Sequence, residues 1–86
     1  MQADILTLKD RVFTATQKSP LAQHVKDVVL EADQDDEGGD FIRIILEVES
    51  LDKAKEADLE ALIESIEKTV GDIDDRFPSV RFADAA

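Results

Sequence analysis

Apolar residues recur every three or four positions in the first segment of the chain. The stripe consists of Ile5, Leu6, Leu8, Val12, Phe13 and Ala15. This period predicts an amphipathic helix that buries the stripe against a core. Pro20 lacks a backbone donor and restricts Ser19, so we expect the helix to end by about Lys18.

The next segment, residues 21–33, fits two patterns. Its apolar residues can be placed on a helical stripe, but the run is rich in valine and also alternates like a strand. Residues 41–49 favour the strand, because apolar and polar positions alternate clearly there and a lone strand leaves its backbone unpaired. We therefore predict a hairpin of residues 25–32 with 41–49, joined by residues 33–40, with a helix over 21–33 as the alternative.

A second helix is predicted further along the chain. Its stripe consists of Leu59, Leu62, Ile63, Ile66, Val70 and Ile73. Phe77 continues the same phase beyond Gly71, and Pro78 ends the helix. Residues 79–83 then alternate as a short strand, with Val80 and Phe82 on one face.

These elements predict one small α+β domain over residues 1–86. We expect an α-β-β-α-β two-layer sandwich, in which two helices cover one face of a three-stranded, mainly antiparallel sheet. The inward residues would be Val28, Leu30, Ala32, Ile42, Ile44, Leu46 and Val48.

The opposite face of the predicted sheet carries apolar residues that the helices cannot cover. In the hairpin these are Val25, Val29, Phe41 and Ile45, beside Arg43. Apolar patches of this kind mark association surfaces, and the simplest partner is a second copy of the chain. The alternatives are that the first helix packs across this face, or that residues 21–33 are helical and the patch does not form.

Composition narrows the classes of function. The 86 residues include 21 acidic and 10 basic side chains, for a formal net charge of -11, and no cysteine. The charge argues against nucleic-acid binding, and the missing cysteines exclude disulfides and thiolate chemistry. No run approaches the roughly 20 apolar residues of a membrane span, and the start does not resemble a signal peptide. We expect a cytoplasmic protein that has no membrane partner.

The acidic hairpin segment has one feature of a cation-binding loop. Asp33, Asp35 and Glu37 alternate before a glycine, and Asp40 follows, as oxygen ligands do in calcium loops. A calcium loop completes its shell with an acid at position twelve, which here is Ile44. A calcium-responsive module is therefore the alternative function, against a solvated turn that binds no metal.

Acidic side chains gather in two places. Asp35, Asp36 and Glu37 lie in the hairpin segment, whereas Glu60 and Glu64 lie on the second predicted helix. Such residues either keep a small protein in solution or form a docking surface for a basic protein.

Catalytic groups are scarce in this chain. His24 is its one histidine, and Ser19 beside Pro20 is better explained as a helix-capping residue. The two adjacent glycines stand among acids that would repel phosphate. We therefore predict a protein that is not an enzyme and that carries no cofactor.

Three features from Leu21 onward are shared with a known family. They are a hairpin that carries a glycine, a helix like the one predicted over residues 59–70, and the segment Phe77-Pro78-Ser79-Val80, which leads into a final strand. Together they resemble the cytoplasmic domain of cation-diffusion-facilitator transporters. The resemblance implies the α-β-β-α-β order and a dimer. Members of that family bind metal in this domain through histidines, and with only His24 present no metal ligand is carried over.

The sequence therefore predicts a non-catalytic interaction module. It would self-associate through Val25, Val29, Phe41 and Ile45 and present its acidic surface to a larger, basic protein.

Overall fold

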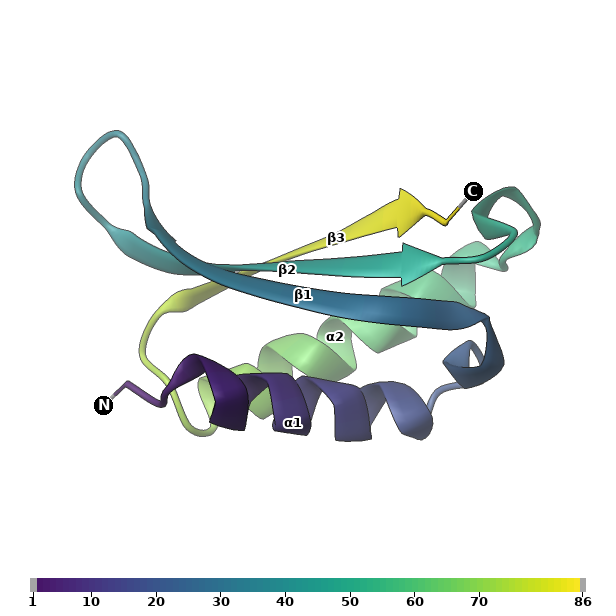
Figure 1. Cartoon of the computed structure of the whole chain (residues 1–86), viewed down its shortest axis with the longest axis horizontal. Helices are drawn as coiled ribbons and strands as arrows, with labels where there is room; N and C mark the ends of the chain where they lie inside the picture. The colour runs from purple at the N-terminus through teal and green to yellow at the C-terminus, as the bar shows by residue number, and fades with distance from the viewer. Residues whose placement is uncertain (1, 86) are drawn as a thin grey trace.

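Two helices lie on one face of a three-stranded sheet (Figure 1). The structure, a computed structural model, describes residues 2–85. Its elements are α1 (Ile5–Gln17), the 3-10 turn η1 (Ala22–His24), β1 (Val25–Gln34), β2 (Asp40–Val48), the 3-10 turn η2 (Leu51–Lys53), α2 (Glu56–Gly71) and β3 (Phe77–Asp84). The predicted α+β class and α-β-β-α-β order are confirmed, and residues 25–34 form a strand rather than a helix.

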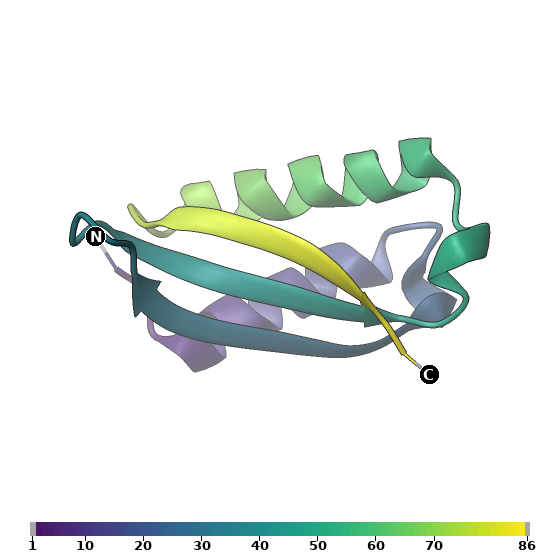
Figure 2. The ribbon, with the colours of Figure 1, turned by 90° about the horizontal axis from the view of Figure 1, so that it is seen from above.

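The sheet is mixed, with the strand order β1-β2-β3. β1 and β2 pair antiparallel as the predicted hairpin, whereas β3 pairs with β2 in the parallel direction. α2 runs back along the sheet from the end of β2, so β3 starts level with the start of β2, with Phe77 opposite Phe41 (Figure 2). A crossover of this kind produces a parallel pair. One of the two pairings is therefore parallel, where we had expected a mainly antiparallel sheet.

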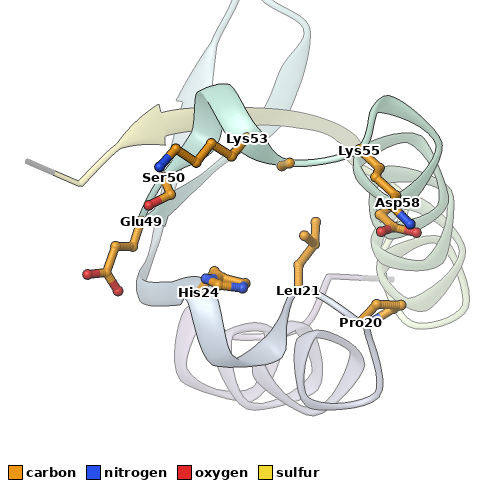
Figure 3. A pocket seen from close by; sticks show the side chains of 9 residues that line it. Pro20, Leu21, His24, Glu49, Ser50, Lys53, Lys55 and Asp58 are labelled. Carbon is orange, nitrogen blue, oxygen red and sulfur yellow. The ribbon is translucent and has the colours of Figure 1, made fainter.

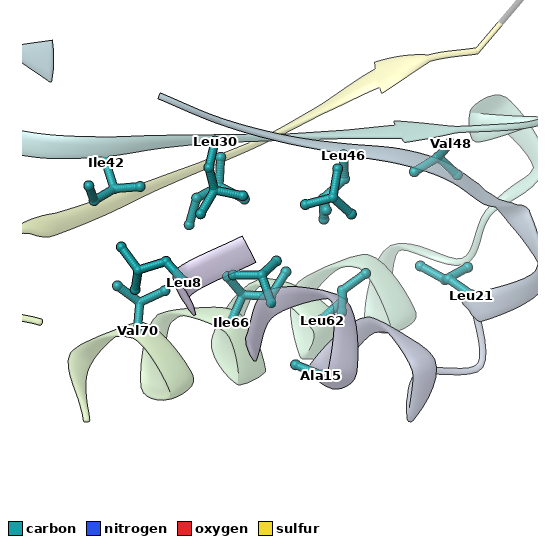
Figure 4. Packing of buried hydrophobic residues seen from close by; sticks show 13 residues of the cluster. Leu8, Ala15, Leu21, Leu30, Ile42, Leu46, Val48, Leu62, Ile66 and Val70 are labelled. Atoms are coloured by element: carbon teal, nitrogen blue, oxygen red, sulfur yellow. The ribbon is translucent and has the colours of Figure 1, made fainter. Parts of the chain in front are cut away.

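The core lies between the sheet and the two helices (Figure 4). β2 is the central strand, and its inward residues Ile42, Ile44, Leu46 and Val48 are fully buried. The remaining members are Leu8, Val12, Ala15, Leu21, Val28, Leu30, Leu62, Ile66 and Val70. Ala32 was expected in this set but is exposed.

Two apolar residues of α1 face solvent instead of the core. Leu6 is 75% exposed and Phe13 is 52% exposed, whereas Leu8 and Val12 are buried. The buried stripe of the helix is narrower than predicted, because α1 packs against β1 and α2 along one side only.

The start of β3 also differs from the sequence-based expectation. α2 ends at Gly71, and Phe77 opens β3 instead of continuing the helix. The backbone N–H of Asp72 donates to the carbonyl of Lys68, and the N–H groups of Ile73 and Asp74 donate to that of Val70, which closes the last turn of α2. The chain then turns into the sheet, so the phenyl ring of Phe77 joins the sheet layer.

An irregularity in β1 changes the side on which Val25 lies. The register shifts between Val25 and Asp27, so Val25 pairs with the buried Val48. An extra residue reverses the alternation of side chains beyond it. Val25 therefore packs against the core and does not lie on the opposite face, where strict alternation had placed it.

Candidate functional site: the outer face of the sheet

The outer face of the sheet is the face opposite the helices, and no other element among residues 2–85 covers it (Figures 1 and 2). Alternation and register place four rows of side chains on it. From the hairpin end these rows are Asp33–Phe41–Phe77, Glu31–Arg43–Ser79, Val29–Ile45–Arg81 and Asp27–Glu47–Ala83. Of the four residues predicted to mediate association, Val29, Phe41 and Ile45 lie here.

Sequence reasoning missed the contribution of β3 to this face. Phe77 is 65% exposed and pairs in register with Phe41, so two phenyl groups lie on neighbouring strands. Arg81 lies in register with Ile45. The alternation of Phe77 with Ser79 and Arg81 was visible in the sequence, but Phe77 also matched the helical phase before it.

The phenyl rings border a hollow of about 330 Å³ at the hairpin end of the face. Its lining is composed of Asp35, Asp40, Phe41, Arg43, Phe77, Ser79 and Arg81. The hollow therefore combines aromatic surface with two guanidinium groups, inside a chain whose net charge is -11.

Arg43 is held by residues of its own face. Its guanidinium lies 5.3 Å from the centre of the Phe41 ring, 3.1 Å from the Asp33 carboxylate and 3.6 Å from that of Glu31. The backbone N–H of Gln34 and the Arg43 side chain together lower the pKa of Asp33. These pairs are half exposed, so they orient Arg43 more than they stabilise the fold.

The acidic hairpin loop uses its oxygen atoms within the turn. Asp35 Oδ1 accepts the backbone N–H groups of Glu37 and Gly39, at 2.9 and 2.8 Å. Gly38 has a φ of 81° and donates to the carbonyl of Asp35, as in a three-residue hairpin loop with a left-handed glycine. Among residues 2–85, no three acidic or histidine side chains are placed to hold a metal ion.

The four candidate ligands of the loop do not converge on one point. Asp33 contacts Arg43, Asp40 accepts from the side-chain amide of Gln34 at 3.0 Å, and Glu37 is exposed. No observation therefore favours the calcium-responsive alternative.

The predicted acidic surface is exposed at both of its places. Asp35, Asp36 and Glu37 are exposed at the tip of the hairpin, and Glu60 and Glu64 are exposed on α2. One acid that follows α2 differs from them, because Asp74 is buried.

Asp74 belongs to a buried ion pair that sequence reasoning did not detect. Arg76 donates to it twice from its side chain, from Nε at 3.0 Å and from a terminal nitrogen at 2.7 Å. Asp74 also accepts the backbone N–H of Ala3 at 2.9 Å, and Arg76 donates to the Ala3 carbonyl at 2.8 Å. This group fastens the segment before α1 to the corner between α2 and β3. Its role is structural.

His24 lines a different hollow, of about 310 Å³, between η1, η2 and the start of α2 (Figure 3). Two carboxylates, from Glu49 and Asp58, share the lining. The Glu49 side chain points away from the hollow and pairs with Lys26 at 3.0 Å, and Asp58 lies on the α2 side. The acids therefore do not converge on the imidazole as a catalytic triad requires.

Neither helix within residues 2–85 has the length and apolar character to cross a membrane.

Comparisons with known proteins establish the fold. No family model matches the chain, and no curated protein matches it. A solved structure described as the copper form of the MamM CTD has a TM-score of 0.56 and is 15% identical to this chain. The alignment covers 95% of this chain and 87% of the MamM chain. A zinc form of a MamM CTD variant has the same TM-score and is 16% identical. Its alignment covers 98% of this chain and 89% of the MamM chain. At such identities the likeness shows the fold alone.

Proposed function

We propose that this chain is a non-catalytic interaction module that self-associates through the outer face of its sheet. The observation that carries the proposal is the uncovered aromatic pair, Phe41 and Phe77, on neighbouring strands. Val29 and Ile45 extend the apolar surface along β1 and β2. Aromatic residues surrounded by polar groups are typical of the centre of a protein interface.

A second copy of the chain fits this face better than an unrelated partner. The face carries both acidic and basic side chains, so it is complementary to itself once it is rotated. The family resemblance supports the same assembly, because cation-diffusion-facilitator transporters dimerise through a domain with this order of elements.

Replacing Phe41 with glutamate is expected to dissociate the dimer. A carboxylate in the centre of the interface would be desolvated without a partner, so the dissociation constant should rise at least about tenfold. Analytical ultracentrifugation of the wild type and of Phe41→Glu at equal concentrations measures this effect.

Phe13→Glu is the matched control, because it makes the same chemical change at an exposed phenyl group on α1. It should sediment like the wild type. A wild type that is monomeric at tens of micromolar, or equal dissociation of both variants, would contradict the proposal.

We further propose that the acidic surface docks onto a basic protein. Asp36, Glu37, Glu60 and Glu64 are exposed, and none of them forms an ion pair within residues 2–85. Carboxylates that are free to meet an incoming cation accelerate association and select the partner. Asp35 adds charge while its carboxylate shapes the loop.

An arginine-rich peptide serves as the basic probe. Glu60→Gln with Glu64→Gln is expected to slow its association about threefold to tenfold at low salt. Fluorescence stopped-flow at several salt concentrations measures the rate. Asp10→Asn with Asp84→Asn removes the same charge elsewhere, and an equal loss in that control would show that only net charge matters.

A further inference from the structure

The charges on the outer face are divided between its two edges. The outer face of β1 carries three acids, Asp27, Glu31 and Asp33. They alternate with the buried Val28 and Leu30, so their side chains project from the outer face. On β3 the only charged residue of the outer rows is Arg81. The face therefore has an acidic edge and a basic edge, with Arg43 and Glu47 between them on the central strand.

Arg43 does not change this division, although it lies in the central strand. Its guanidinium pairs with Asp33 and Glu31, so it is drawn toward β1 and is largely neutralised there. Arg81 has no ion-pair partner among residues 2–85 and is exposed. Arg81 is therefore the cation of this face that remains available to a second molecule.

We infer that two copies stack face to face with β1 of each copy over β3 of the other. The two-fold axis then runs parallel to the strands, close to β2. This inference rests on the proposed self-association, and it adds the orientation of the partner. Face-to-face sheets keep their strands within about 30° of each other and lie about 10 Å apart, so this orientation is sterically ordinary.

Charge selects this orientation over the alternative. A two-fold axis across the strands would place β1 over β1 and bring Asp27, Glu31 and Asp33 of the two copies together. Like charges brought together in an interface weaken association. With the axis along the strands, Arg43 and Glu47 each meet their own counterpart near the axis, but the three acids of β1 are kept apart. Arg81 of one copy then lies over the row of Val29 in the other, between Asp27 and Glu31.

The first test reverses the charge of the basic edge. Arg81→Glu would add a fourth acid against β1 of the partner, and we expect the dissociation constant to rise about tenfold. Arg11→Glu on α1 makes the same change in net charge on an exposed residue outside this face, and should leave the dissociation constant within about twofold.

The second test uses the absence of native cysteine in the chain. Val29→Cys on β1 and Ser79→Cys on β3 are mixed, one of them carrying a size tag, and treated with a short bis-maleimide. The inferred orientation predicts cross-linked mixed dimers and little cross-linking of Val29→Cys with itself. Circular dichroism of each variant checks that it is folded.

The outcomes separate this inference from the proposed function. Efficient cross-linking of Val29→Cys with itself, or a dimer that Phe41→Glu dissociates and Arg81→Glu leaves intact, would overturn the orientation alone. A monomeric wild type would overturn the proposed self-association together with the orientation.

Discussion

Replacing Asp74 with asparagine is expected to lower the free energy of unfolding by about 3 kcal/mol, because breaking a buried ion pair leaves the other charge uncompensated. The side chain of Arg76 is only 11% exposed, and its guanidinium would lose its carboxylate partner. Both oxygens of Asp74 accept from N–H groups, so the amide nitrogen of asparagine would meet a donor in either orientation. Urea denaturation followed by circular dichroism measures the change.

Asp72→Asn is the control for this variant. Asp72 is exposed at the C-terminal end of α2, where a negative charge opposes the helix dipole. Its replacement should leave stability unchanged or raise it by a few tenths of a kcal/mol. If both variants lost the same stability, the buried pair would not be the cause.

Acidification below about pH 4 is expected to destabilise the wild type by about 2–3 kcal/mol through Asp74. Hydrogen bonds from the Arg76 side chain, and then from the backbone of Arg76 and Ala3, hold the pKa of Asp74 well below its usual range. The unfolded chain therefore takes up this proton first. The stability that Asp74 contributes is complete above the unfolded pKa, and it is lost as the pH falls toward the folded pKa.

Urea denaturation between pH 7 and pH 2 measures this dependence. The wild type should lose stability more steeply than Asp74→Asn, so that the two curves converge at low pH. Asp4 acts in the same direction, because the Thr7 backbone N–H lowers its pKa, and its contribution remains in both proteins. Parallel curves would show that the acid sensitivity originates elsewhere.

The central strand and the second helix could be predicted because their environments are uniform. β2 has a core on one side and the outer face on the other, so its residues alternate without interruption. α2 buries one stripe of Leu62, Ile66 and Val70. In both elements the period of apolar residues follows directly from the burial.

The predictions from the sequence were wrong where a tertiary contact overrides the local pattern. One inserted residue at the start of β1 moved Val25 to the core side, and no local signal marks it. Phe77 satisfied a helical period and a strand period at once, and the packing of the α2–β3 corner decided between them.

The buried ion pair of Asp74 could not be predicted from the sequence either. In the sequence Asp74 is one of several acids after α2, and its neighbours Asp72 and Asp75 are exposed. Its burial depends on Ala3, which is 71 positions away in the chain. A contact of that separation leaves no period in the sequence, so only the folded structure reveals the ion pair.

The parallel pairing of β3 determines the order in which the strands of the sheet pair during folding. β1 and β2 are joined by a short hairpin, which forms within about 1–10 µs in isolated peptides. β3 reaches β2 only after the intervening crossover has closed, and this long-range step is slower. Phe77 and Arg81 therefore join the outer face last. A chain in which β3 has not yet paired lacks the basic edge of the outer face and one of its two phenyl groups. Under the proposed self-association, only chains that have finished folding therefore dimerise.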